Sequence, residues 1–239
     1  MFSGMDPMNS AMDVQVSLVG PVDLAGFRTE VWQLLAHQVP PESVQWTLAL
    51  ASQYADPKAP QDSRPRNVAR AATSIIPASF TRLCEFVVLH RDPDRFNLLY
   101  RLLWRLVHEP SLRNDLLDVD MLQAQHMAHA VRRDLHRLKV NLQLHAVRDA
   151  TGRELQLACH EPAHHVVEAA GPWLCKRLLA PCWALFTPER SVRCEQGHLL
   201  YGPGVPRWAL PRDDATEEAW LACHAQVFDR AEDDRPALA

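Results

Sequence analysis

The sequence predicts an α+β fold that is rich in helices, with short antiparallel strands and a small N-terminal β-α-β unit. Two observations carry this prediction. Apolar residues recur at helical spacing through the middle of the chain, and short strand-like segments separated by turn residues follow in a block of their own. The composition agrees, since 239 residues with 47% hydrophobic and 23% charged side chains are ordinary for a globular protein of one or two domains.

The N-terminal part predicts the β-α-β unit. Val14–Val19 alternates as a strand does, Asp23 can cap a helix that runs to about His37, and Val44–Leu50 is a second strand. A proline-rich polar stretch follows, which is typical of a linker. The predicted organisation is 1–12 disordered, 13–53 β-α-β unit, 54–77 linker or long loop, 78–228 main α+β domain, and 229–239 disordered tail.

Three helices are predicted in the middle of the chain. The first contains Phe80–Val88, whose apolar residues follow the i, i+3, i+4, i+7 pattern. The second is capped by Asp92, with a proline in its first turn, and ends before Pro110. The third runs from about Asp118 to Leu138.

The remaining chain predicts short strands and two more helices. A turn at Asp149–Gly152 joins the first two strands, and a helix from Pro162 is expected to be interrupted at Gly171-Pro172. The last helix is capped by Asp214 and ends at Phe228. The predicted strands are Val140–Val147, Leu155–Cys159, Trp183–Phe186, Ser191–Cys194 and His198–Tyr201.

Several functional classes are disfavoured by the sequence. No apolar run approaches the 18 residues of a transmembrane helix, and no secretory signal is recognisable at the N-terminus. The six cysteines form no CxxC pair, which is typical of reduced thiols and predicts a cytoplasmic protein. No glycine-rich phosphate loop is present, so we expect no nucleotide cofactor.

Arginine dominates the basic residues, because only three of the 25 are lysine and 22 are therefore arginine. Arginine binds phosphate with a planar fork, although codon bias in a GC-rich genome also enriches arginine. The third predicted helix turns its basic residues away from its apolar face, which suits contacts with a phosphate backbone; an ordinary solvated face is the alternative. The candidate nucleic-acid-binding residues are Arg91, Arg95, Arg101, Arg105, Arg132, Arg133, His136, Arg137, Lys139 and Arg177.

Aromatic residues alternate with arginines in the second predicted helix. Tyr100 and Trp104 lie beside Arg101 and Arg105, an arrangement that suits stacking on unpaired or flipped bases. It equally suits a core helix whose arginines extend to its edge. The candidate substrate-pocket residues are Tyr100, Trp104, Trp183 and Thr187.

The segment from His160 to His164 reads HEPAH and so matches the HExxH zinc-protease motif. Pro162 argues against that function, because the residue before a proline is pushed out of the helical region and the two histidines then share no continuous helix. We interpret the segment as a strand-to-helix turn, in which Glu161, His164 and His165 form an acid–base or anion-binding cluster. A polar cap with one buried histidine is the alternative, and a metal held by these side chains stays open.

Five segments together resemble a known family. Asp92–Leu106, Val131–Lys139, Glu161–Val166, Trp183–Pro188 and Tyr201–Gly204 are similar to its blocks RDPxRFxLLYRLLWRL, VRRDxHKMK, EPxHHIV, WSILTPD and FGPG. The family is a bacterial domain of uncharacterised function, found alone or fused to X-type uracil-DNA glycosylases. Stand-alone members are described as DNA repair or DNA metabolism proteins and are associated with a radical-SAM protein thought to modify DNA.

The resemblance, which covers roughly residues 78 to 228, implies an accessory protein of DNA repair or modification that binds DNA and acts with a radical-SAM iron–sulfur partner. The chain departs from the family where Cys159-His160 replaces an aromatic pair. It also lacks the glycosylase motifs and the CxxxCxxC of a radical-SAM cluster. Two alternatives remain: an enzyme that acts on a damaged or modified base through Glu161, His164 and His165, and a protein–protein adaptor without DNA contact.

Overall fold

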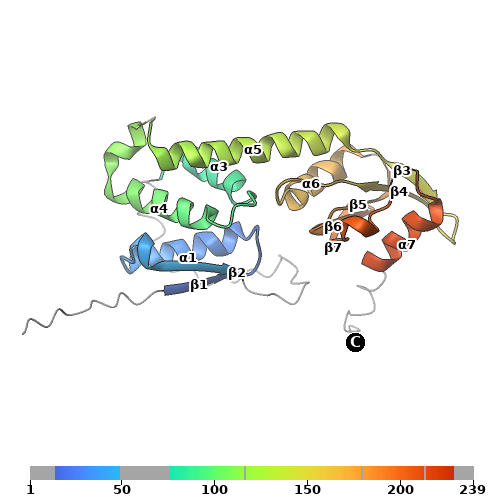
Figure 1. The fold of residues 1–239 in the computed structure, drawn as a ribbon, viewed down its shortest axis with the longest axis horizontal. Coiled ribbons are helices and arrows are strands. Elements are labelled where there is room, and N and C mark those ends of the chain that lie inside the picture. The colour runs from blue at the N-terminus through green and yellow to red at the C-terminus, as the bar shows by residue number, and fades with distance from the viewer. Residues whose placement is uncertain (1–13, 49–75, 116, 179, 213, 229–239) are drawn as a thin grey trace, which may run out of the picture. The chain divides into compact units, whose positions relative to one another are not determined.

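The computed structural model describes residues 14–48, 76–115, 117–178, 180–212 and 214–228 (Figure 1). The predicted disorder at 1–12 and 229–239 and most of the predicted linker lie outside these residues. The chain forms two compact units. Of the described residues, the N-terminal unit contains those up to Val88 and Asp92–His126, and the C-terminal unit contains Leu89–Arg91 and those from Met127 on. This division falls within the 78–228 segment that the sequence predicts as one domain.

The N-terminal unit begins with the predicted β-α-β motif. Strands β1 (Val14–Leu18) and β2 (Val44–Leu48) pair in parallel, and helix α1 (Leu24–Ala36) connects them. As predicted, Asp23 caps α1, its carboxylate accepting a hydrogen bond from the Gly26 N–H at 2.7 Å. A short 3-10 helix, η1 (Pro41–Ser43), precedes β2.

Two further helices complete the core of this unit. Helix α3 (Ala78–Val87) buries the predicted apolar face, and α4 (Arg95–His108) buries its leucines and Phe96. Helix α4 begins at Arg95 and not directly after Asp92, because the Asp92 carboxylate caps the preceding turn by accepting from the Asp94 N–H at 2.9 Å. The 3-10 helix η2 (Pro110–Asn114) then leads toward α5 (Val119–Asn141).

The C-terminal unit is built on a five-stranded sheet whose spatial order follows the chain order, β3-β4-β5-β6-β7. The pairs β3–β4, β5–β6 and β6–β7 are antiparallel, as predicted, but β4 and β5 are parallel. The exception arises because a helix, α6 (Val167–Arg177), carries the chain back from the end of β4 to the start of β5. The strands are β3 (His145–Arg148), β4 (Glu154–Cys159), β5 (Cys182–Phe186), β6 (Arg190–Glu195) and β7 (His198–Pro203).

Helix α7 (Glu217–Phe228) covers one face of this sheet. Leu155 and Leu157 of β4 and Phe186 of β5 form a buried cluster with Trp220 and Phe228 of α7. The predicted cap at Asp214 is wrong, since α7 begins three residues later and its first turn is bonded to Thr216. A 3-10 helix, η3 (Arg207–Ala209), lies between β7 and α7.

Helix α6 (Val167–Arg177) covers the other face. Tyr201 of β7 meets Gly171 of α6, whereas its neighbour Gly202 meets α7, and adjacent residues of a strand point to opposite faces. The predicted interruption at Gly171-Pro172 is wrong, because α6 runs through Pro172. The carbonyl of Glu168, which loses its helical donor to Pro172, accepts a 3.4 Å hydrogen bond from the Tyr201 hydroxyl instead.

Helix α5 is longer than predicted. It ends at Asn141, so the strand expected over Val140–Val147 is shortened to β3. None of the described helices is long and apolar enough to cross a membrane.

Candidate functional site

The HEPAH segment is irregular backbone between β4 and α6. His160 extends the β4–β5 ladder, since its N–H donates to the Phe186 carbonyl at 3.0 Å, and the helix begins only at Val167. The two motif histidines therefore share no helix, as Pro162 predicts. The helix start predicted at Pro162 is wrong, because four residues separate Pro162 from α6. Within the described residues, no group of three His, Cys, Asp or Glu side chains could hold a metal ion.

Glu161 points away from the histidines that follow it. Its carboxylate pairs with the Arg207 guanidinium at 2.9 Å, and both side chains are at least half exposed. An exposed ion pair of this kind adds little to stability. The predicted Glu161–His164–His165 cluster thus loses its carboxylate to a different partner.

His164 contacts Asp134 of α5 and the short Leu89–Arg91 segment. Its N–H donates to the carboxylate of Asp134 at 2.9 Å, and its ring lies 4.3 Å from that of His90. Its Nδ1 accepts the Arg91 N–H at 3.3 Å, so the neutral ring carries its proton on Nε2. Burial, followed by the neighbouring His90, lowers the pKa of His164, while Asp134 acts in the opposite direction.

His165 faces a carboxylate that lies outside the predicted Glu161–His164–His165 cluster. Its Nδ1 lies 2.7 Å from Glu189, and the other oxygen of that carboxylate pairs with the Arg91 guanidinium. The His165 N–H donates to the Leu89 carbonyl at 2.9 Å, which fixes the backbone beneath the ring. His165, Glu189 and Arg91 therefore form a hydrogen-bonded group in which a proton can move between imidazole and carboxylate.

The loop that carries Glu189 is fixed by close backbone packing. A Cβ on Gly204 would stand 2.2 Å from the Pro188 carbonyl oxygen, a distance that only a glycine permits. Thr187 is fully buried, and its hydroxyl donates to the Arg190 carbonyl at 2.6 Å. The structure therefore gives Thr187 and Gly204, which both fall within the family-like blocks, a role in shaping this loop.

A partly buried ion pair lies behind the loop. The Glu168 carboxylate of α6 lies 2.8 Å from Arg190 Nε, and the two side chains form an ion pair. The Arg190 Nε–H is not aligned for a hydrogen bond. The guanidinium also lies over the Tyr201 ring at 5.4 Å. Burial raises the pKa of Glu168, although Arg190 opposes the shift.

The four residues of the predicted substrate pocket pack within their own units, Tyr100 and Trp104 in the N-terminal one and Trp183 and Thr187 in the C-terminal one. Tyr100 is fully buried, and its hydroxyl donates to the Val39 carbonyl at 2.6 Å. Trp104 stacks on His108 at 4.2 Å. Trp183 is 2% exposed and borders a cavity of about 10 Å³, which is roughly the space of one water.

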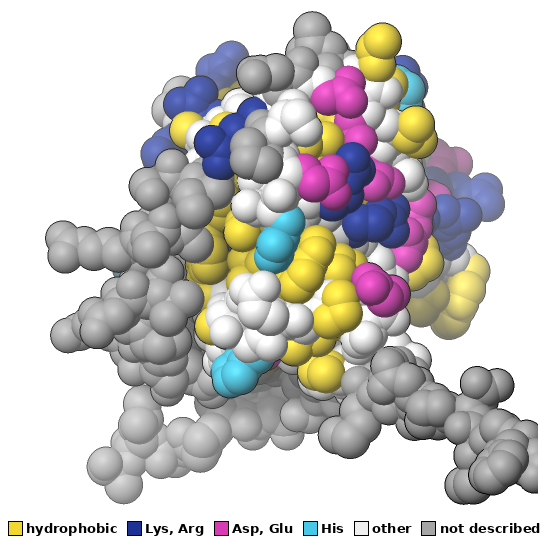
Figure 2. All heavy atoms as spheres, turned by 90° about the vertical axis from the view of Figure 1, so that its left-hand side faces the viewer, with side chains coloured by type: hydrophobic (Ala, Val, Ile, Leu, Met, Phe, Trp, Pro, Cys, Tyr) yellow, Lys and Arg dark blue, Asp and Glu magenta, His cyan; other side chains and the backbone are white. Residues whose placement is uncertain are grey.

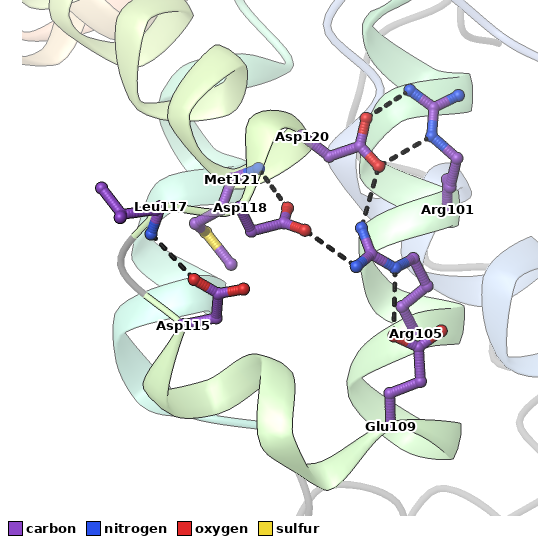
Figure 3. Close-up of polar contacts among 8 residues, drawn as sticks. All are labelled: Arg101, Arg105, Glu109, Asp115, Leu117, Asp118, Asp120 and Met121. Carbon is purple, nitrogen blue, oxygen red and sulfur yellow. Dashed lines mark hydrogen bonds and ion pairs between the residues drawn. The ribbon is translucent and has the colours of Figure 1, made fainter.

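The predicted basic residues of α4 are engaged within the N-terminal unit. Arg95 is 3% exposed, and its guanidinium donates to three backbone carbonyls. Arg101 binds Asp120 at 2.8 Å, and Arg105 binds Asp118 at 2.8 Å as well as Asp120 at 3.1 Å (Figure 3). On the face that Figure 2 shows, several Lys and Arg side chains to the right of centre lie among Asp and Glu side chains.

These ion pairs fix the ionisation of the acidic partners. The hydrogen bond from Arg101 is the main cause that lowers the pKa of Asp120. Desolvation works against the ionised form of Asp118, but the bond from Arg105 still holds its pKa below the usual range. The arginines of α4 are thus neutralised locally, which leaves little positive potential for a phosphate.

The basic residues of α5 are placed differently. Arg132, Arg133, His136 and Arg137 are all exposed on the C-terminal unit, and we call these four residues the α5 basic face. Among the described residues, no carboxylate lies within 4 Å of Arg133 or Arg137. Lys139, one turn further on, is half-buried with its ammonium 4.7 Å from the Trp173 ring, and Arg177 is exposed at the end of α6.

The comparisons with known proteins give one match. Residues 93–234, more than half of the chain, match a family described as a domain of unknown function, DUF4130. The chain belongs to the DUF4130 family. No curated protein and no solved structure gives a significant match. The DUF4130 segment includes α4, α5 and the whole sheet of the C-terminal unit.

Two residues of the site were missed, although the sequence held a signal for each. Asp134 is 4% exposed and lies three residues after Val131 and four before Leu138, on the apolar side of α5. A carboxylate at such a position needs a buried donor. Glu189 follows Pro188 at the place where the family-like block TPD has its acidic residue.

Proposed function

We propose that this DUF4130 protein is a cytoplasmic accessory protein of DNA repair or DNA modification, which binds DNA through the α5 basic face and acts with a radical-SAM partner. The observation that carries the DNA contact is that Arg133 and Arg137 are exposed, with no carboxylate of the described residues within 4 Å. A guanidinium without an acidic partner keeps its five donors for phosphate oxygens.

The contrast with α4 sharpens this proposal. Arg101 and Arg105 carry the same charge as Arg133 and Arg137, but Asp118 and Asp120 already occupy their donors. A phosphate would have to displace a carboxylate at α4, whereas at Arg133 and Arg137 no carboxylate of the described residues competes with it. The proposed interface therefore keeps the basic residues of α5 and leaves out those of α4.

Fluorescence-anisotropy titrations test the DNA contact directly. Labelled single-stranded, duplex, and uracil- or abasic-containing oligonucleotides are titrated with the protein at two salt concentrations. Salt-sensitive binding supports the proposal, and tighter binding of one form identifies the substrate. No binding of any oligonucleotide at low salt refutes it.

The radical-SAM partner and the repair context come from the sequence resemblance alone. Their test is co-purification of a tagged radical-SAM protein with this chain after nuclease treatment. Retention without DNA affinity of this chain supports instead the adaptor without DNA contact, which a net charge of −4 favours.

A second candidate function is an enzyme that acts on a damaged or modified base. The contact between His165 Nδ1 and Glu189 at 2.7 Å favours it, because imidazole and carboxylate can exchange a proton. Arg91 pairs with the same carboxylate, and all three side chains are at least partly exposed. Glu189 here takes the place expected for Glu161. His165→Ala should abolish turnover without changing the melting temperature; a lowered melting temperature alone would make the histidine structural.

A further inference from the structure

The C-terminal unit carries an open groove that the sequence did not predict. It has a volume of about 390 Å³ and lies between the ends of α5 and α6. We call it the Trp173 groove. It is lined mainly by Lys139, Leu142, Leu144, Trp173, Leu174 and Arg177.

The groove combines an accessible aromatic ring with positive charge. Trp173 and Leu144 are each 37% exposed, and Leu174 is buried beneath them. The charged residues that line the groove are Lys139 and Arg177, and no carboxylate lines it among the described residues. A ligand that fits this lining has a flat apolar face and negative charge beside it.

The groove continues the α5 basic face. Arg132, His136 and Lys139 are spaced by four and three residues, so they lie along one side of α5. Seven residues of helix rise about 10 Å, so the α5 basic face runs toward the groove over that length. A strand that follows the α5 basic face therefore arrives at Trp173.

We propose that the Trp173 groove binds an unpaired nucleotide of single-stranded DNA, with the base stacked on the face of the Trp173 ring that Lys139 does not cover and the adjacent phosphates held by Lys139 and Arg177. The nucleotide must be unpaired, because the bases of a duplex are stacked on one another and present no free ring face. This inference rests on the proposed DNA contact and specifies that the bound DNA is single-stranded. The volume is within the range of about 300–1,000 Å³ that small ligands occupy.

The experiment compares two tryptophan variants of the full chain. Trp173→Ala should weaken binding of a short labelled oligothymidylate by about 5- to 150-fold, the usual effect of losing one base–aromatic stack. Trp173→Phe should restore most of the affinity. Trp208→Ala is the matched control, because Trp208 is 88% exposed in the same unit and outside the groove, and it should leave binding unchanged.

A second probe separates the base from the phosphates. An oligomer of the same length in which every nucleoside is an abasic analogue keeps the charge but offers no ring. Wild-type protein should bind it less tightly than oligothymidylate, and Trp173→Ala should not distinguish the two. The slope of binding affinity against salt should be the same for wild type and Trp173→Ala, because stacking releases no counterions.

The outcomes distinguish this inference from the proposed function. If the wild type binds oligothymidylate and Trp173→Ala binds it equally well, the groove is not the base site, while the DNA contact of α5 stands. If no oligonucleotide binds but phosphatidylserine vesicles or an acidic peptide do, both the inference and the proposed function fail. Circular dichroism and melting of each variant confirm that the fold is intact.

Discussion

The contact between Gly171 of α6 and Tyr201 of β7 allows a direct test of how α6 packs on the sheet. A Cβ added at Gly171 would stand 2.8 Å from the Tyr201 hydroxyl oxygen, whereas ordinary contacts begin near 3.4 Å. Gly171→Ala must therefore push the hydroxyl away by about 0.6 Å. The 3.4 Å hydrogen bond that this hydroxyl donates to the Glu168 carbonyl then breaks.

The sign of the change in the free energy of unfolding on Gly171→Ala shows whether the contact with Tyr201 is present. In a helix without such a contact, Gly→Ala stabilises by about 1 kcal/mol through backbone propensity. Here the overpacking costs about 1–3 kcal/mol, and the carbonyl that Pro172 has already deprived of its helical donor loses its replacement. We expect Gly171→Ala to lower the free energy of unfolding, or at most to leave it unchanged.

Tyr201→Phe completes a double-mutant cycle with Gly171→Ala. Alone it removes one long hydrogen bond and should cost about 1 kcal/mol or less. In combination it removes the atom that the new methyl group strikes, so the double variant should be more stable than the sum of the single effects by at least about 1 kcal/mol.

Urea titrations followed by far-UV circular dichroism measure the four free energies of unfolding. Gly20→Ala serves as the control, because a Cβ there meets nothing within 4 Å. Additive effects of Gly171→Ala and Tyr201→Phe, or a clear stabilisation by Gly171→Ala alone, would refute the packing of α6 described above.

Three further predictions follow from the buried and paired groups. The free energy of unfolding should fall as the pH drops below about 6.5. Burial lowers the folded-state pKa of His160 and His164, so the unfolded chain binds more protons than the folded chain in this pH range. In thermal melts, the melting temperature of the double variant His160→Asn, His164→Asn should depend less steeply on pH than that of the wild type. Burial raises the pKa of Cys84 to about 12, so mass spectrometry should find it unalkylated by iodoacetamide at neutral pH until the protein unfolds. Arg105→Gln should lower the melting temperature by a few degrees, because it removes the ion pairs of Arg105 shown in Figure 3, whereas Arg113→Gln should not. An equal effect of both variants would contradict a stabilising role of these ion pairs.

Much of the fold could be predicted from local patterns. The apolar spacing of Phe80–Val88 and the Asp23 cap are properties of neighbouring residues, and both are found in the structure. The parallel pairing of β4 with β5 could not be read in the same way, because it depends on where α6 packs. The start of α6 was placed too early because proline at a first helical turn is a common pattern that also fits an irregular loop.

The candidate site was harder to predict because its side chains meet across long sequence separations. Arg101 and Arg105 look available in the sequence, yet the carboxylates that neutralise them follow 13 to 19 residues later, beyond η2. Glu189 reaches Arg91 across 98 residues. The exposed Arg133 could be predicted, because it depends only on the orientation of one helix.

The α5 basic face is tested most directly by the salt dependence of DNA binding. The triple variant Arg132→Gln, Arg133→Gln, Arg137→Gln removes three proposed phosphate contacts, each contributing about 0.9 to the slope of log K against log salt for duplex DNA. We predict that the slope becomes shallower by up to about 2.7. A control triple variant at exposed arginines of the N-terminal unit changes the net charge equally and should keep the wild-type slope; its positions are Arg28, Arg82 and Arg113. Equal slopes for the wild type and the α5 variant would contradict the account.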